Sequence, residues 1–407
     1  MADLVLALNA GSSTIKFALF SVDDAGPEAK FRGLIEDRMG QPKMRAWAAD
    51  GRLVDEGEWP SDAGRDAGFW ARIVLEWAEA RIGGDRLCAV SHRVVHGGPD
   101  YAEPVLVTDA VLSALDALSP LAPLHQPDNL AMVRAVMATR PALHNVACFD
   151  TAFFRDLPPV AQRAPIPRAW ADKGVRRYGF HGLSYAYLQR RLQELKPREE
   201  PKRVIFAHLG SGASLCGCLD GAPIDTTMGF SPLDGLVMST RCGALDPGIA
   251  LYLQRTGGLD VEALEHMLYR QSGLLGVSGL SGDMRVLQQS QAVEAREAVD
   301  LFVYRLVQQV GALTASLGGL DALVFSGGIG EHAAEIRRRV CEALEWLGLQ
   351  LDEAANAAGQ TDISTPQSLV SAMIIPTDEE DSLASGAFAA LGPDFALRGL
   401  ETSRIAV

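Results

Sequence analysis

The sequence has few of the features that mark secreted, membrane-bound or disulfide-rich proteins. Its 407 residues contain six scattered cysteines: Cys88, Cys148, Cys216, Cys218, Cys242 and Cys341. No apolar run approaches the roughly 20 residues of a membrane-spanning helix. Asp3 stands near the start, where a signal peptide would be basic and then apolar. We therefore expect a cytoplasmic protein with reduced thiols and no membrane contact.

Positive charge is scarce as well. The chain carries 37 Lys and Arg residues against 51 Asp and Glu residues, which gives a formal net charge of −14. Such a surface repels nucleic acids and anionic membranes, so neither is an expected partner. A phosphate-binding site must then be a local basic pocket within an acidic protein.

Two familiar signatures are also missing. The pattern G-x-x-x-x-G-K-[ST] does not occur, which excludes a P-loop nucleotide site. Cys216 and Cys218 alternate onto one face of an expected strand, but no second pair of ligands has zinc spacing. A zinc site is therefore disfavoured.

The chain does contain one type of segment twice. Residues 4–22 have the pattern of an apolar strand, a turn rich in glycine and hydroxyl side chains, and a returning strand. Residues 203–219 repeat this pattern with an offset of 200, which aligns Ala7 with Ala207. Such turns suit a phosphate, because glycine lets the backbone approach a ligand. Two of them in a chain long enough for two domains predict a duplicated α/β fold with a ligand between its halves, as in a phosphotransferase.

Other candidate residues lie at strand ends and in glycine-rich loops. Arg93 follows an apolar strand and precedes two glycines, as suits a bidentate contact with a carboxylate or phosphate, although a solvated arginine is the plain alternative. Asp150 ends another strand, at the edge where open α/β sheets bind ligands and metals. His181 has glycines close on both sides, and Arg241 lies in a loop where it would clamp an anion. His125 fits a ligand donor and a plain loop histidine equally well.

A competing pattern lies near the C-terminus. Gly328, Gly330 and Ala333 match a dinucleotide-binding fingerprint between a strand and a helix, with Asp352 about 20 residues further on. The same bare backbone would equally accept a nucleoside. Residues 378–381 place four acids at a strand end, which suits either a solvated loop or a metal site.

Together these motifs resemble the acetokinase family, within the actin, Hsp70 and sugar-kinase superfamily, over nearly the whole chain. The resemblance rests on the segments Asn9–Phe17, His92–Gly98, Pro123–Pro127, Phe149–Phe153, Tyr178–Gly182, His208–Gly210, Met228–Phe230, Thr240–Arg241 and Gly328–Glu331. It implies two ribonuclease-H-like (actin-like ATPase) α/β domains with a central interdomain cleft. The first would comprise residues 1–150 and about 385–407, and the second, which binds nucleotide, residues 151–384. A homodimer is also implied.

The activity that this resemblance implies is Mg²⁺-dependent phosphoryl transfer between ATP and acetate, giving ADP and acetyl phosphate, with Mn²⁺ as a substitute metal. Arg93 and Arg241 would bind acetate and the transferring phosphoryl group, and Asp150 would be the catalytic carboxylate. His181 and, less centrally, His125 would donate to the phosphoryl oxygens.

The remaining implied roles fall into four groups. Asn9 and Glu379 would organise Mg²⁺. The acyl pocket would be lined by Val95, Leu124, Phe180 and Pro232. The phosphates would be flanked by Ser12, Thr14, Lys16, His208, Leu209, Gly210, Ser211 and Gly212. The nucleoside would be held by Asp283, Met284, Arg285, Gly328, Ile329, Gly330 and Glu331.

Physical chemistry agrees with these roles. A loose phosphoryl-transfer transition state needs positioning and positive charge around three oxygens more than a strong base. Acetate is already ionised at neutral pH. Val95 would crowd longer acids, but one methylene is worth only about 1–3 kcal/mol, so propionate should be a poorer substrate that is not excluded.

Some positions depart from the family pattern, and some alternatives stay open. Ser211 replaces a usual Asn, Met284 a usual Phe and Asp378 a usual Asn, and Ala244 stands where an acid is common. A propionate or butyrate kinase is the nearest alternative. An actin- or Hsp70-like ATPase would share the hairpins without the paired arginines, a sugar kinase would carry Asp at the position of Asn9, and a dehydrogenase rests on the glycine fingerprint alone.

Overall fold

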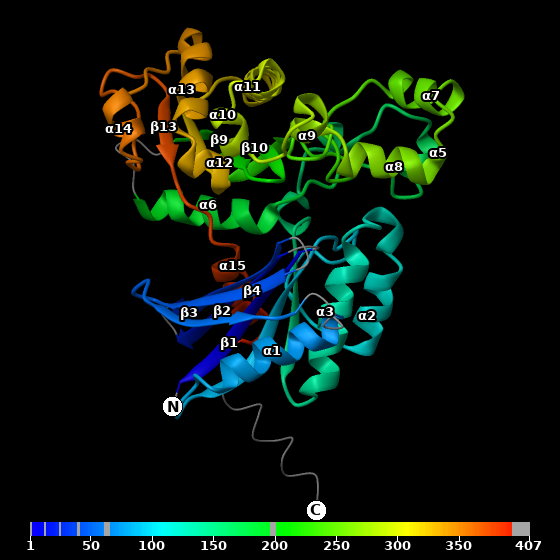
Figure 1. Cartoon of the computed structure of the whole chain (residues 1–407), viewed down its shortest axis with the longest axis vertical. Coiled ribbons are helices and arrows are strands. Elements are labelled where there is room, and N and C mark those ends of the chain that lie inside the picture. Colours follow the sequence, from blue (N-terminus) through cyan, green and yellow to red (C-terminus); the bar gives the residue numbers. More distant parts are fainter. Residues whose placement is uncertain are drawn as a thin grey trace, which may run out of the picture. The chain divides into compact units, whose positions relative to one another are not determined.

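The structure is a computed structural model that describes residues 2–11, 14–23, 26–38, 41–60, 66–195 and 201–392. Its contacts divide the chain into two compact units. Unit 1 comprises residues up to Ala152 together with those from Asp378 onward, and unit 2 is Phe153–Thr377. Each unit is built around one β-sheet, so the expected α/β class is confirmed (Figure 1). Within the described residues, no helix is long and apolar enough to cross a bilayer.

The point where the chain returns to unit 1 differs from the sequence-based expectation of about residue 385. The structure places it at Asp378. The reason is that α15 (Glu379–Leu391) is one continuous helix, which packs against the unit 1 sheet along its length. A boundary at 385 would cut this helix in two.

Unit 1 has an eight-stranded sheet in the order β5-β4-β3-β2-β1-β6-β8-β7. Its strands are β1 (Asp3–Ala10), β2 (Thr14–Asp23), β3 (Gly26–Arg38), β4 (Gln41–Ala48), β5 (Leu53–Glu58), β6 (Arg86–Val94), β7 (Val105–Leu106) and β8 (His144–Phe149). Its helices besides α15 are α1 (Ala67–Glu79), α2 (Asp109–Asp116), the 3₁₀ turn η1 (Ser119–Leu121) and α3 (Gln126–Thr139), and the 3₁₀ turn η2 (Ala152–Phe154) spans the boundary. Strands β1, β6 and β8 run parallel to one another.

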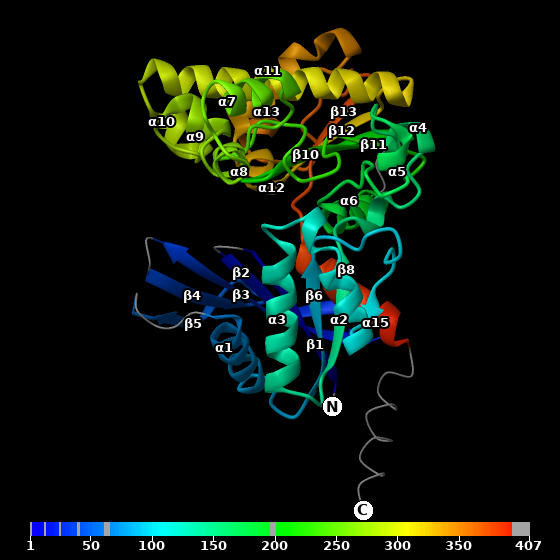
Figure 2. The same cartoon turned by 90° about the vertical axis from the view of Figure 1, so that its right-hand side faces the viewer.

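Alternation along β1 decides which side chains reach the site. Leu6 and Leu8 point to one face and pack with Trp70 and Val74 of α1 and with residues of α3. The opposite face carries Asn9 and is covered by α15 (Figure 2). The polar site residues of unit 1 therefore lie on the α15 side of the sheet.

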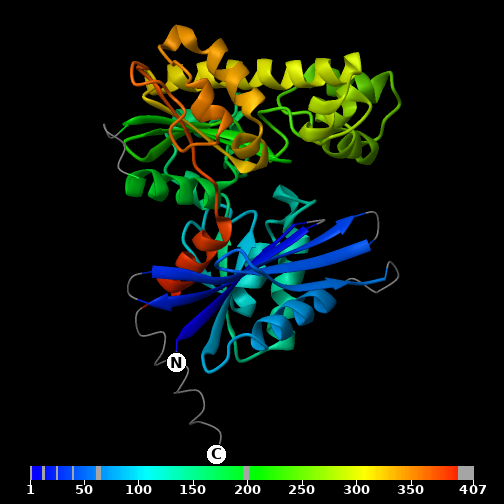
Figure 3. The ribbon, with the colours of Figure 1, turned by 60° about the vertical axis from the view of Figure 1, so that its left-hand side comes forward.

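Unit 2 has a five-stranded sheet in the order β11-β10-β9-β12-β13. Its strands are β9 (Arg203–Leu209), β10 (Ala213–Leu219), β11 (Ala222–Thr226), β12 (Ala322–Ser326) and β13 (Ser371–Ile374). Its helices are α4 (Pro159–Gln162), α5 (Arg168–Ala171), α6 (Gly182–Leu195), α7 (Pro247–Arg255), α8 (Val261–Arg270), α9 (Gly273–Ser278), α10 (Met284–Gln289), α11 (Val293–Leu317), α12 (Gly327–His332), α13 (Ala334–Ala343), the 3₁₀ turn η3 (Glu345–Leu347) and α14 (Glu353–Ala357). Helix α6 packs on one face through Tyr185 and Leu188, and the long α11, yellow in Figure 3, covers the other through Leu313 and Leu317.

The two sheets share one arrangement. In each, an antiparallel hairpin and a third strand precede two parallel strands, so that β3-β2-β1-β6-β8 corresponds to β11-β10-β9-β12-β13. The predicted pair of hairpins is therefore confirmed. Their pairing registers differ, however, because Ala10 pairs with Ile15 whereas Leu209 pairs with Ala213. Four residues separate the first pair and three separate the second, so the second turn is one residue shorter. The 200-residue offset therefore aligns the strands of the two hairpins in sequence, but equivalent residues do not pair with equivalent residues across each hairpin.

Candidate active site

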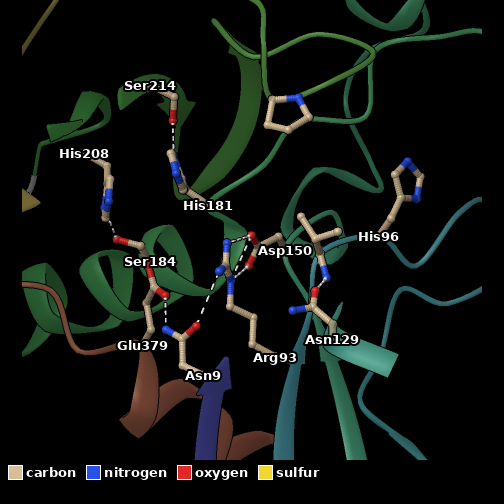
Figure 4. A network of polar contacts seen from close by, with 12 residues as sticks. Asn9, Arg93, His96, Asn129, Asp150, His181, Ser184, His208, Ser214 and Glu379 are labelled. Atoms are coloured by element: carbon tan, nitrogen blue, oxygen red, sulfur yellow. Dashed lines mark hydrogen bonds and ion pairs between the residues drawn. The ribbon is translucent and has the colours of Figure 1, made fainter. Parts of the chain in front are cut away.

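An arginine and a carboxylate meet at the carboxyl edge of the unit 1 sheet. Arg93 lies near the end of β6, and Asp150 directly follows the parallel neighbour β8. Arg93 Nε donates to Asp150 Oδ1 at 3.0 Å, and Nη2 donates to Oδ2 at 2.5 Å (Figure 4). The Asp150 side chain is 1% exposed and that of Arg93 is 21% exposed. Burial alone would lower the pKa of Arg93, but the charges of Asp150 and Glu379 and the hydrogen bond to Asp150 raise it above its ordinary value.

Asn9 connects this pair to the first turn of α15. Its Nδ2 donates to Glu379 Oε2 at 2.8 Å, and its Oδ1 accepts from Arg93 Nη1 at 3.4 Å. Glu380 lies beside Glu379 and is buried, and this burial raises the pKa of its carboxyl group. Asn9 therefore links Arg93 to Glu379 within unit 1.

The start of α15 is fixed by residues next to the site. The Asp378 carboxylate accepts from the Asp381 N–H at 3.0 Å, which is an N-cap. Arg32 on β3 donates to the same carboxylate, through Nη1 at 3.0 Å. Asp378 thus forms an ion pair that holds the helix turn carrying Glu379.

The other unit 1 candidates that the structure describes lie on or next to β2, β6 and α3. Val95 is buried directly after β6, while Leu124 and His125 are half-buried just before α3. Thr14 closes the β1–β2 turn by accepting the Gly11 N–H at 2.8 Å on its carbonyl oxygen. Lys16 is exposed on β2, and Ser12 lies outside the described residues.

In unit 2, serines hold two histidines. The Nδ1 atom of His181 lies 2.8 Å from Ser214 Oγ, and His208 Nδ1 lies 2.8 Å from Ser184 Oγ. The two imidazole rings stack with centroids 4.4 Å apart. The backbone of His181 has a φ of 61°, a strained conformation for a residue with a side chain. Such strain at a residue held by hydrogen bonds is typical of a functional position.

A glycine turn lies against these groups. A methyl group on Gly212 would be 2.7 Å from Arg241 Nη2 and 3.1 Å from His181 Nε2. Arg241 Nη1 donates to the Pro232 carbonyl at 2.7 Å, which fixes the guanidinium. The structure therefore brings Arg241, His181 and the turn of Gly210, Ser211 and Gly212 together in unit 2, next to His208 and Leu209 at the end of β9.

A second glycine turn follows β12. One oxygen of Glu331, Oε1, accepts from the Gly327 N–H at 2.9 Å and from the Thr377 N–H at 3.2 Å. This carboxylate holds the start of α12, the short helix that contains Gly328, Ile329 and Gly330. Asp352, the acid that the dinucleotide fingerprint would use, is the N-cap of α14, where it accepts from the Ala355 N–H at 2.9 Å.

The remaining nucleoside candidates lie at α10. Asp283 caps the helix by accepting from the Arg285 N–H at 2.9 Å, and the two side chains form an ion pair. That partner and the helix amides lower the pKa of Asp283. Met284 is buried.

The oxygen ligands available in unit 1 suit a Mg²⁺ ion that enters together with the phosphates of a substrate. Among the described residues there is no cluster of three or more His, Cys, Asp or Glu side chains arranged for a metal. Glu379 offers a half-buried carboxylate beside Asn9, whereas both oxygens of Asp150 accept from Arg93. Mg²⁺ in kinases is usually held by one or two carboxylates, waters and substrate phosphates, so this sparse oxygen set is sufficient.

Sequence reasoning missed several polar residues that support the site. Ser184 and Ser214 hold the histidines, and Thr377 Oγ1 lies 2.7 Å from Ser184 Oγ. Asn129 on α3 holds the backbone of Val95. Ser214 lies within the second predicted hairpin, but it contacts a histidine 33 residues away in the chain, so no local pattern pointed to this contact.

Two sheets of one shared order, each with a glycine turn next to polar strand ends, define a two-unit actin-like ATPase fold. The sequence matches the Acetokinase family over residues 4–385. The chain belongs to the acetokinase family, which comprises phosphotransferases with a carboxyl group as acceptor.

Relatives and solved structures agree with this assignment. Curated acetate kinases from Rhodopseudomonas palustris (strain TIE-1) and Methylocella silvestris are 48% and 45% identical, covering 94% and 96% of this chain and 97% and 98% of theirs. The crystal structure of Porphyromonas gingivalis acetate kinase has a TM-score of 0.82 at 34% identity, covering 96% of this chain and all of that one. A Francisella tularensis propionate kinase has a TM-score of 0.86 at 34% identity, covering 94% and 98%.

Proposed function

We propose that this protein catalyses reversible, Mg²⁺-dependent phosphoryl transfer from ATP to acetate, giving acetyl phosphate and ADP. The observation that carries the proposal is the charged Arg93, held by the buried Asp150 at a strand end beside Val95. A fixed guanidinium next to an apolar side chain suits a small carboxylate that has one polar end and one methyl group.

In this proposal Arg93 binds the acetate carboxylate and, as charge shifts, an oxygen of the transferring phosphoryl group. Acetate is ionised at neutral pH, so no base has to remove a proton before attack. Asp150 directs both of its oxygens at Arg93. Its contribution is therefore to orient the guanidinium and keep it charged, which serves a transition state that depends on positioning and electrostatics.

Unit 2 supplies the groups for the nucleotide side of the reaction. Arg241 and His181 are held next to the Gly212 turn, where each would donate to phosphoryl oxygens. Ser214 holds Nδ1 of His181, which leaves the imidazole orientation set before substrate binds. The turn that ends at Glu331 would hold the nucleoside against bare backbone. His125, Thr14 and Lys16 are assigned secondary contacts to phosphate.

Glu379 would hold Mg²⁺, and Asn9 would orient Glu379 through the 2.8 Å hydrogen bond between them. When bound, the metal would neutralise phosphate charge. We also propose, from family membership, that the two units are the two ribonuclease-H-like domains, and that the protein is a cytoplasmic homodimer.

A propionate kinase is the second candidate, because one of the similar solved structures carries that name. Val95, buried two residues after Arg93 in the chain, argues for the smaller acid. One added methylene in such a pocket changes kcat/KM by about 10- to 200-fold, so a direct comparison of the two acids separates the candidates.

The test is acyl hydroxamate formation from ATP, Mg²⁺ and either acetate or propionate, with wild type beside Arg241→Ala. We expect a higher kcat/KM with acetate, and a loss of about 10²-fold or more in the variant, because an anion clamp is removed. Arg305→Ala, which removes an exposed arginine of α11 in the same unit, is the control. A higher kcat/KM with propionate would favour the second candidate, and ATP hydrolysis without hydroxamate would refute both.

A further inference from the structure

Asn129 bridges two strand ends that carry the site of unit 1 (Figure 4). It lies in the first turn of α3, and its side chain is 4% exposed. Its Nδ2 donates to the Ala10 carbonyl at 2.8 Å, and its Oδ1 accepts from the Val95 N–H at 3.0 Å. Ala10 is the last residue of β1 and Val95 is the first residue after β6. One carboxamide therefore joins the ends of two neighbouring strands.

The bridge stands where the backbone ladder stops. β1 and β6 pair in parallel up to Leu8, which lies opposite His92. Ala10 and Val95 lie beyond that pair, and each takes the Asn129 side chain as a hydrogen-bond partner. Ligands in open α/β sheets bind outside the carboxyl ends of strands. Asn129 thus fixes the separation of β1 and β6 at the edge where a ligand would bind.

A second carboxamide on the same face of α3 strengthens this arrangement. Gln126 precedes Asn129 by three residues, a spacing that places both on one side of the helix. Its Oε1 accepts from the His96 N–H at 3.1 Å, and its Nε2 donates to the His96 carbonyl at 3.0 Å. Helix α3 therefore holds two successive residues, Val95 and His96, through side-chain amides.

We propose that Asn129 is a positioning residue that sets the length of acid the protein accepts, an inference that rests on the proposed function. Val95 would form the wall against the acyl chain, and Asn129 fixes its backbone. The same amide fixes Ala10, whose neighbour Asn9 orients Glu379. Without the bridge Val95 can move away from Arg93, which makes room for another methylene. Nucleotide contacts in unit 2 stay unchanged.

The test compares Asn129→Leu, which has similar size and no hydrogen bonds, with Asn129→Asp, which keeps an acceptor for the Val95 N–H. The readout is the ratio of kcat/KM for acetate to that for propionate, measured together with KM for ATP. In Asn129→Leu the ratio should fall about tenfold while KM for ATP changes less than about twofold. Asn129→Asp should retain more of the ratio.

A matched control separates positioning from general stability. Asn145 on β8 is also 4% exposed, and its side chain bonds to His92 at 2.8 Å and to the Leu143 carbonyl at 3.0 Å. Asn145→Leu should lower the unfolding temperature and leave the acid ratio as in wild type. An unchanged ratio in Asn129→Leu would overturn the inference. If that variant does not fold, Asn129→Ala, which also removes both hydrogen bonds, takes its place, and an unchanged ratio in it would overturn the inference.

Hydrogen exchange separates this inference from the proposed function. If the wild type forms no acyl phosphate from any short acid, the proposed function fails, and amide exchange still decides the role of Asn129. The peptide containing Val95 should exchange faster in Asn129→Leu than in wild type or Asn145→Leu, because its amide has lost an acceptor. Equal protection in all three proteins would overturn the positioning role.

Discussion

Replacing Arg93 by Met takes away the guanidinium that engages both oxygens of the Asp150 carboxylate. Methionine keeps much of the packing of the arginine stem. Asp150 is 1% exposed, so water cannot replace the lost hydrogen bonds without a structural change. Removing one partner of a buried ion pair costs about 3–5 kcal/mol. Arg93 is itself 21% exposed, so we expect a loss at the low end, about 3 kcal/mol.

The measurement is urea unfolding followed by tryptophan fluorescence, for which Trp70 and Trp77 report from the core of unit 1. An unchanged slope would show that a shifted midpoint reflects stability. The double variant Arg93→Met/Asp150→Leu should recover most of the loss, because the buried Asp150 carboxylate that lost its partner is also removed. Hydroxamate formation should fall about 10²-fold or more in both variants.

An exposed pair of the same geometry provides the control. Arg140 donates to Glu79 through Nε at 2.6 Å and Nη2 at 2.8 Å, with side chains 36% and 35% exposed. Arg140→Met should therefore cost at most about 1 kcal/mol. Equal losses for the Arg93 and Arg140 variants, or a double variant as unstable as the sum of the two single changes, would refute the argument from burial.

Two further predictions follow from buried or crowded groups. Stability should fall as the pH drops from about 6.5 to about 4, because burial lowers the pKa of His92 to about 4 and only the unfolded chain takes up the proton in that window. This change in the free energy of unfolding, about 3 kcal/mol between those pH values, should be absent in His92→Gln when urea unfolding is measured at each pH. An equal dependence of unfolding free energy on pH in wild type and variant would contradict the prediction. Gly212→Ala should lower kcat by about 10²-fold with little change in unfolding midpoint, because its methyl group would displace Arg241 and His181; wild-type kcat would contradict the geometry.

Much of the site was predictable because parallel strands end at a common edge. Arg93 and Asp150 each follow an apolar strand, so their meeting is a consequence of β6 lying beside β8. The separate roles of Arg93 as ligand-binding group and Asp150 as its buried partner were not predictable, because they depend on the burial of Asp150 and on which atoms of the two side chains face each other. The burial of Met284 was also not predictable, because its place next to Asp283 in the chain does not show how it packs in the folded protein.

The supporting residues were missed for a different reason. Asn129 acts on Ala10, which is 119 residues away in the chain. No periodicity or spacing rule links a helix amide to a strand end at that distance. The same holds for Ser214 on β10, which contacts His181, 33 residues away and just before α6.

The sequence by itself determined the strands, the duplicated hairpins and the family, because these depend on local hydrophobic patterns and on motifs of a few residues. Tertiary structure alone decided the pairing registers of the two hairpins, the return of the chain to unit 1 at Asp378, and the partners of Arg93, His181 and Asn129. These features depend on contacts between residues far apart in the chain, and such contacts exist only once the helices have packed on the sheets.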